Sequence, residues 1–179
     1  QVAAAAADQQ QRAAHRAGAE GVRLPLGQAG PELLGRLRPA LHELGLVLFE
    51  EAQGTQRVTL PPQRAAFETI AELDDPRIRA LIDISMLMPA LPPSYLLRLR
   101  EAGLPAEFVD LLATAWRDGA ALDSARELLG GGRVPGRIHA LFMNLFVRFG
   151  DSDARDLRQV LPLVGGVHLK FWDLDDADD

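Results

Sequence analysis

Apolar residues follow two different periods along the first half of the chain. The segments 31-PELLGRLRPALHELG-45 and 61-PPQRAAFETIAEL-73 begin with proline and carry apolar residues at helical spacing, which predicts two helices. The segment 21-GVRLPL-26 alternates with a period of two, which predicts a short strand. The runs over 46–54 and 78–87 are nearly continuous in apolar residues, which is typical of strands in a parallel sheet. The order strand–helix–strand–helix–strand predicts an α/β fold with helices covering the sheet.

The second half of the chain changes to a mainly helical pattern. Helices are predicted over 93–103, 105–119, 121–132, 136–150 and 151–162, in addition to an Ala-rich helix over 2–17 at the start. A Pro and a Gly pair then lead into a last predicted strand, 167-VHLKFW-172. We therefore expect a single domain over 1–179, in which residues 89–160 form a helical insertion or cap.

Composition excludes several classes of function. Apolar residues make up 47% and charged residues 25% of the 179, which is ordinary for a globular protein. The net charge of −6 argues against nucleic-acid or membrane-surface binding. The chain has no Cys, so disulfides, thiolate metal sites and Cys nucleophiles are excluded. With no apolar run of about 18 residues and no signal-peptide pattern, we expect a cytoplasmic protein with no membrane partner.

Polar residues interrupt three of the predicted strands near their carboxyl ends. The second strand ends in Glu50 and Glu51, the third carries Asp83, and the last carries His168 and Lys170. In parallel α/β folds the carboxyl ends of the strands meet at one rim, and chemistry gathers there. Carboxylate and imidazole groups suit Mn²⁺, Mg²⁺, Co²⁺ or Zn²⁺. The joint placement of these residues therefore predicts a divalent metal site.

Alternation places these side chains on one face of the sheet. Asp83 shares a face with Leu81 and Ser85, and His168 shares a face with Lys170. The opposite face is apolar in both strands, and in the last strand it consists of Val167, Leu169 and Phe171, which we expect to lie under helices. An interior that becomes polar at one rim is what a barrel of parallel strands requires. The predicted fold is thus a partial (β/α)8 barrel of about four parallel strands with a helical elaboration.

Each of these residues also has a structural alternative. The alternative for Asp83 is that it caps a neighbouring loop, and the alternative for Glu50 and Glu51 is that they form a solvated strand end. The alternative for His168 is that it is a hydrogen-bonded histidine of the core. For Arg23 the sequence supports two interpretations equally: it faces the barrel interior near a substrate anion, or it pairs with a carboxylate.

The segments LVLFEEAQG, ALIDISML and GGVHLKFWD resemble the sugar phosphate isomerase/epimerase superfamily, the xylose-isomerase-like TIM barrels. In that family successive strands supply a Glu, an Asp, a His and a final Glu as metal ligands. The family pattern E-x-[HN]-G is similar to 51-EAQG-54, which favours Glu51 over Glu50 and puts Gln53 in place of the usual His or Asn. The His strand of the family often has the pattern H-x-K, which His168 and Lys170 match.

This resemblance implies a metal-dependent isomerase or epimerase that moves a proton on a sugar or polyol-like substrate through an enediolate. The implied metal ligands are Glu51, Asp83 and His168, with Glu51 and Lys170 as catalytic residues. Substrate contacts are expected from Arg23, Gln53 and Lys170, and association with a second copy is possible under this hypothesis.

The sequence also departs from the family. Met86 stands three residues after the Asp, where many members have a His, and no strand follows 167–172 to supply the final Glu. Together with a first residue that is Gln, this predicts the middle and late part of a longer barrel, which would be inactive by itself. The alternative function is a non-catalytic helical module that binds a partner through Leu96, Leu97, Leu99, Phe108, Leu111, Leu112 and Trp116.

Overall fold

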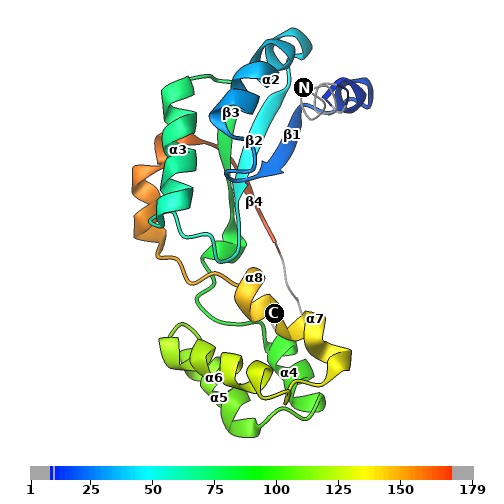
Figure 1. Cartoon of the computed structure of the whole chain (residues 1–179), viewed down its shortest axis with the longest axis vertical. Coiled ribbons are helices and arrows are strands. Elements are labelled where there is room, and N and C mark those ends of the chain that lie inside the picture. Colours follow the sequence, from blue (N-terminus) through cyan, green and yellow to red (C-terminus); the bar gives the residue numbers. More distant parts are fainter. Residues whose placement is uncertain (1–8, 10, 171–179) are drawn as a thin grey trace, which may run out of the picture.

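The computed structural model describes residue 9 and residues 11–170, and it contains one sheet of four parallel strands in the order β1-β2-β3-β4 (Figure 1). The strands are β1 (Gly21–Pro25), β2 (Val47–Ala52), β3 (Ile78–Asp83) and β4 (Val164–His168). Each strand pairs in parallel with the next one along the chain. The predicted fold class, an α/β chain forming part of a parallel barrel, is confirmed.

Two helices connect the first three strands and cover one face of the sheet. Helices α2 (Pro31–Leu44) and α3 (Pro61–Leu73) begin with a proline, which is tolerated there because the first helical N–H has no partner within the helix. Gly45 ends α2 in the left-handed conformation with φ 68°. The core between helices and sheet includes Leu34, Leu37, Leu41, Leu48, Phe67, Ile70, Ile78, Ala80 and Ile82. The predicted helices 31–45 and 61–73 are therefore confirmed.

The predicted N-terminal helix lies only partly within the described residues. Residues 11–16 are helical, and Gly18 follows them with φ 80°. Residues 1–8 and 10 of the predicted segment 2–17 lie outside the described part of the chain.

The last strand begins earlier than the sequence predicts. β4 contains both Gly165 and Gly166, which the sequence analysis placed before the predicted strand 167–172. A Cβ atom on Gly165 would lie 2.7 Å from the Cβ of Arg79, so the absence of a side chain lets β4 approach β3. The pairing is irregular at this point, between Ala80 and Leu81. The predicted start of the strand was wrong because glycine residues also allow two strands to pack closely. Residues 171–172 of the predicted strand lie outside the described residues.

Two further details of the strands differ from the prediction. Val167 and Leu169 are 55% and 61% exposed rather than buried under helices, because β4 is an edge strand that no helix among the described residues covers on that side. β3 ends at Asp83, so the predicted strand 78–87 is too long, and Ser85 lies in a 3₁₀ turn over Ile84–Met86.

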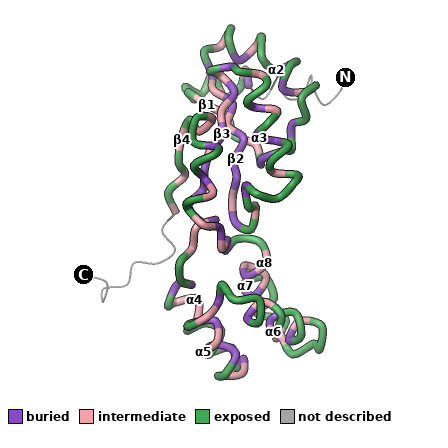
Figure 2. The backbone as a smooth tube through the Cα atoms, turned by 90° about the vertical axis from the view of Figure 1, so that its left-hand side faces the viewer, coloured by how far each residue is buried: buried purple, intermediate pink, exposed green. Residues whose placement is uncertain are grey.

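A second group of helices forms what we call the helical lobe (residues 88–149), beside a sheet lobe made of the rest of the described chain (Figures 1 and 2). Its helices are α4 (Pro93–Glu101), α5 (Ala106–Ala115), α6 (Gly119–Gly130), α7 (His139–Phe142) and α8 (Asn144–Val147). The single helix predicted over 136–150 is thus broken. The segment 151–162 forms 3₁₀ helices over Ala154–Gln159 and Leu161–Leu163, and its Leu157 and Val160 join the core of the sheet lobe.

The helical lobe has its own apolar core. Of the residues proposed above as a partner-binding surface, Leu99, Phe108, Leu112 and Trp116 are buried in this core. Leu96 and Leu111 pack against it, and Leu97 is exposed. These side chains therefore pack on one another, which removes the main support for the non-catalytic alternative. Among the described residues, no helix combines the length and the apolar character that crossing a membrane requires.

Two chain segments pass between the lobes and pair with each other. Leu87 and Asp151 form an antiparallel bridge, and Gly150 N donates to Ser85 O at 2.8 Å. Gly54, in the loop after β2, packs directly on this crossing. A Cβ atom on Gly150 would lie 2.0 Å from Gly54 O and 2.5 Å from the Cα of Met86. The position of the helical lobe therefore depends on backbone contacts that leave no room for a side chain.

Replacing Gly150 by Ala should lower the free energy of unfolding by about 2–4 kcal/mol, because the added methyl group meets rigid backbone atoms. Gly35→Ala is the matched control, since Gly35 lies on an exposed part of α2 with nothing within 4 Å of an added Cβ. It should instead stabilise by about 0.5–1 kcal/mol through helix propensity. Thermal unfolding followed by circular dichroism measures both. Equal melting temperatures for the two variants would contradict the close packing of the lobes.

Candidate metal centre

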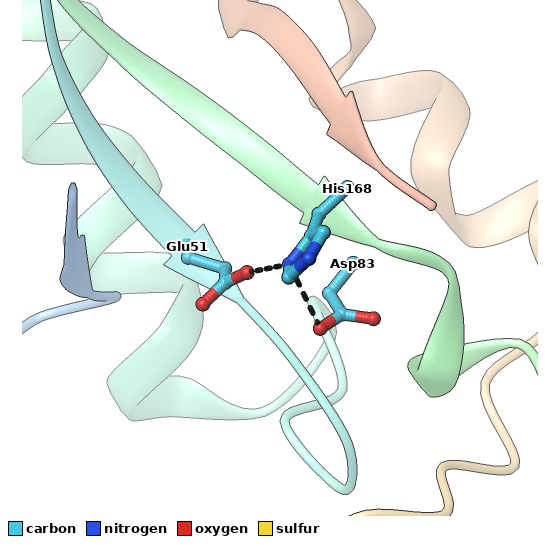
Figure 3. A group of neighbouring side chains, drawn as sticks. All are labelled: Glu51, Asp83 and His168. Carbon is cyan, nitrogen blue, oxygen red and sulfur yellow. Dashed lines mark hydrogen bonds and ion pairs between the residues drawn. The ribbon is translucent and has the colours of Figure 1, made fainter. Parts of the chain in front are cut away.

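Three side chains from three neighbouring strands meet at the carboxyl edge of the sheet. Glu51 lies near the end of β2, and Asp83 and His168 are the last residues of β3 and β4. The register pairs Asp83 with His168, which brings the two strand ends level. One ligand atom from each of the three residues lies within 4.8 Å of the others (Figure 3).

The His168 imidazole lies between the two carboxylates. Its Nδ1 is 2.7 Å from Glu51 Oε1 and 3.5 Å from Asp83 Oδ2 (Figure 3). Glu51 and Asp83 are 1% and 0% exposed. Nδ1 donates to a carboxylate when it carries a hydrogen, and the same nitrogen without hydrogen offers a lone pair to a metal ion. Two buried carboxylate oxygens and one imidazole nitrogen are a donor set that fits Mn²⁺, Co²⁺, Zn²⁺ or Mg²⁺.

Cationic side chains from the outer strands pair with the same carboxylates. Arg23 of β1 donates from Nη1 to Glu51 Oε2 at 2.6 Å, and Lys170, just after β4, forms an ion pair with Asp83 Oδ2. The pairing of Arg23 with a carboxylate is therefore confirmed, and its contact with a substrate anion stays a prediction, although Arg23 also lines the pocket described below. These pairs compensate for burying the negative charges.

Asp83 has separate roles for its two oxygens. Oδ1 accepts a hydrogen bond from Ser85 N at 2.9 Å, so this residue caps the following turn as its structural alternative proposes. Oδ2 faces Lys170 and His168. Burial raises the pKa of Asp83, but the hydrogen bonds from Lys170 and Ser85 outweigh it and hold this pKa below its usual range. Asp83 is therefore an anion at neutral pH.

Glu50 and Glu51 point in opposite directions because they are neighbours in a strand. Glu50 accepts hydrogen bonds from Gly27 N at 3.2 Å and Ala29 N at 3.3 Å, which hold the loop after β1. Burial raises the pKa of Glu50, and these two hydrogen bonds only partly oppose it. The structure thus brings Glu51, and not Glu50, into the cluster.

A pocket of ≈ 470 Å³ lies over the cluster, between the two lobes. The lining residues are Arg23, Gln53, Gly54, Ser85, Val147, Arg148, His168 and Lys170. All three residues predicted to contact substrate, Arg23, Gln53 and Lys170, therefore face one space. Met86, which occupies the position of the family's usual His, is fully buried in the core of the sheet lobe.

Sequence reasoning missed Val147 and Arg148. They lie at the end of α8, in a region predicted as one uninterrupted helix, and nothing in their local pattern distinguishes them. Their part in the pocket arises from the packing of the helical lobe against the loop after β2.

The chain is similar to two curated proteins. It is 28% identical over 162 residues to a 3'-dehydrocarminate deglycosidase alpha subunit of Microbacterium, in an alignment that covers 82% of this chain and 46% of the relative. It is 26% identical over 159 residues to a C-glycoside deglycosidase alpha subunit of Arthrobacter globiformis, which covers 86% and 45%. The chain thus spans about half the length of the curated relatives it matches. No family model matches it.

Replacing Lys170 by Met should raise the pKa of Asp83, because burial then acts on the carboxylate with less opposition. Carbon-13 NMR titration of the Asp carboxyl groups in metal-free protein measures this pKa. Lys170→Arg is the matched control and should keep the pKa low, since the positive charge remains. An Asp83 pKa that is the same in Lys170→Met as in the parent would show that Lys170 does not set the charge of this carboxylate.

Proposed function

We propose that this chain is the metal-binding part of a carbohydrate-processing enzyme subunit, which removes a proton next to a carbonyl group of a sugar-like substrate. The observation that carries this proposal is the convergence of Glu51, Asp83 and His168 on one point beneath an open pocket. The names of the two relatives, both alpha subunits of deglycosidases, support carbohydrate as the substrate and an assembly with another kind of subunit.

Glu51, Asp83 and His168 would hold the divalent metal ion. When bound, such an ion supplies Lewis-acid polarisation of substrate oxygens. The protein's own contribution is a set of charges fixed in place, because all three ligands lie at the ends of paired strands rather than on loops. Ser85 and Lys170 keep Asp83 anionic and oriented.

Side chains of this chain would then accept the proton and stabilise the negative charge that develops on the substrate. Glu51 is the better candidate for the proton carrier, because its carboxylate contacts Arg23 and His168, whereas one oxygen of Asp83 is engaged in capping the turn at Ser85. Lys170 and Arg23 place positive charge beside the pocket, where a carbonyl oxygen gains negative charge as the proton leaves. Gln53 offers an amide that can bind a sugar hydroxyl.

Two finer reactions share this first step. In an isomerase or epimerase, as the superfamily resemblance implies, the proton returns to a neighbouring carbon or to the opposite face. In a deglycosidase acting on a 3'-dehydro glycoside, a base takes the proton from C2', the electron pair forms a C1'–C2' double bond, and the bond from C1' to the aglycone breaks. The aglycone leaves with the electron pair of that broken bond and takes up a proton. The names of the relatives favour the second reaction for this chain.

Metal binding is the first test of this proposal. Isothermal titration of the protein with Mn²⁺ or Co²⁺ should reveal one saturable site, which Asp83→Asn and His168→Ala each weaken by roughly 100-fold or more through loss of a ligand. Asp123→Asn is the control, because Asp123 is an exposed residue of α6 paired with Arg126 far from the cluster in sequence. Metal affinity unchanged in the two ligand variants would refute the proposed site.

The second test separates the two reactions. Full-length protein, together with any subunit that co-purifies with it, is incubated in deuterated water with a 3'-dehydro C-glycoside. We expect deuterium at C2' or release of free aglycone, both reduced by roughly 100-fold or more in Glu51→Gln, because a carboxamide cannot accept the proton. Mass spectrometry and chromatography give the readout. Epimerised substrate without aglycone release would instead support the isomerase reaction. If neither product forms, both reactions are excluded.

A further inference from the structure

Ser85 is a buried polar residue at the point where three segments of the chain meet. It lies in the 3₁₀ turn that follows β3, it is 1% exposed, and it lines the pocket over the metal centre. Its atoms hydrogen-bond to Asp83 of the cluster, to Gly54 in the loop after β2 and to Gly150 in the returning chain. Ser85 is therefore placed to connect the cluster with both of these segments.

Each polar atom of Ser85 has a different partner. Its N donates to Asp83 Oδ1 at 2.9 Å, and its O accepts from Gly150 N at 2.8 Å. Its Oγ accepts a hydrogen bond from Gly54 N at 3.2 Å. Of these three bonds, the one at Oγ alone depends on the side chain, because the other two use backbone atoms of Ser85.

The hydroxyl group of Ser85 also interacts with the Asp83 carboxylate. A serine hydroxyl has one hydrogen to donate and lone pairs that accept. The bond from Gly54 N uses a lone pair, so the hydrogen remains for another acceptor. The side chain of Ser85 helps to hold the pKa of Asp83 low through a hydrogen bond, which identifies this carboxylate as the acceptor. Ser85 Oγ thus joins Gly54 N to Asp83.

The crossing between the lobes is a short ladder of backbone hydrogen bonds that includes Ser85. Gly150 N donates to Ser85 O, and Gly150 O accepts from Met88 N at 3.0 Å. Ser152 N donates to Met86 O at 2.9 Å. These bonds join the chain that leaves the sheet lobe to the chain that returns from the helical lobe. The turn that orients Asp83 is therefore also one side of the crossing.

Gly54 packs against both the helical lobe and the crossing. A Cβ atom on Gly54 would lie 2.1 Å from Val147 O at the end of α8, and a Cβ atom on Gly150 would lie 2.0 Å from Gly54 O. Closely packed backbone atoms transmit a displacement from one contact to the next. The bond from Gly54 N to Ser85 Oγ therefore ties the position of the helical lobe to the orientation of Asp83.

We propose that Ser85 is a positioning residue that couples the metal centre to the docking of the helical lobe. Its hydroxyl orients Asp83 and Gly54 together, so the metal affinity of the cluster depends on the contact between the lobes. Metal binding in turn strengthens that contact, because coupling between two sites is reciprocal. This inference rests on the proposed metal centre, and it adds a means by which the helical lobe regulates that centre.

The first test removes the hydroxyl and keeps both backbone hydrogen bonds. Isothermal titration of the full chain with Mn²⁺ should show about tenfold weaker binding in Ser85→Ala, because groups that orient a metal ligand typically contribute this much. Ser85→Thr keeps a hydroxyl and should recover most of the affinity. Ser152→Ala is the matched control, since Ser152 Oγ is buried at the same crossing and has no hydrogen-bond partner among the described residues. It should leave Mn²⁺ affinity within about twofold of the parent.

The second test measures the reverse direction of the coupling by hydrogen exchange and mass spectrometry. Adding Mn²⁺ to the parent should slow amide exchange in residues 148–152 several-fold, because metal binding stabilises the crossing. Exchange in α6, which does not line the pocket over the centre, should stay unchanged. In Ser85→Ala saturated with Mn²⁺, the slowing in residues 148–152 should be lost.

Three results would overturn the proposal. These are parental Mn²⁺ affinity in Ser85→Ala, a lower melting temperature of that variant without a change in Mn²⁺ affinity, and slowed exchange in residues 148–152 that persists in the metal-saturated variant. Failure of the parent to bind Mn²⁺ would instead refute the proposed metal centre. Exchange in residues 148–152 without metal then still tests the link, since it should be faster in Ser85→Ala, and equal rates would refute it.

Discussion

This structure depends on two carboxylates that are buried side by side at the carboxyl ends of the central strands β2 and β3. Removing an ion from water costs on the order of several kcal/mol unless cations and hydrogen-bond donors replace the lost solvent. Glu51 and Asp83 find those partners in Arg23 of β1, in His168 at the end of β4 and in Lys170 just after it. The compensation therefore draws on all four strands, and it links the charges at the site to the pairing of the sheet.

The same arrangement explains how a long helical segment contributes to the pocket. The chain leaves the sheet after β3 and returns before β4, and its two passages pair at Leu87 and Asp151. Gly54 and Gly150 let the loop after β2 touch this crossing directly. One wall of the pocket thus comes from the strand ends and the opposite wall from the end of α8. A substrate between them would contact both lobes.

The chemistry at the site is a combination of buried anions and surrounding cations. Such a combination can hold a metal ion, accept a proton and stabilise negative charge on an oxygen within one pocket. Isomerisation and removal of an aglycone both use these three abilities, so the cluster is compatible with either. The proposal of aglycone removal draws on the names of two relatives, deglycosidase alpha subunits that are 28% and 26% identical to this chain.

The sequence by itself determined the parts that depend on local pattern. Proline starts, a glycine stop and the two periods of apolar residues predicted α2, α3 and the first three strands, and alternation predicted that Asp83 and His168 lie on one face of the sheet. Tertiary structure decided the rest. Gly165 and Gly166 belong to a strand because β4 packs closely on β3, and Glu51 rather than Glu50 joins the cluster because register and strand direction fix its face. Arg148 reaches the pocket through contacts between residues far apart in the chain, which no local pattern encodes.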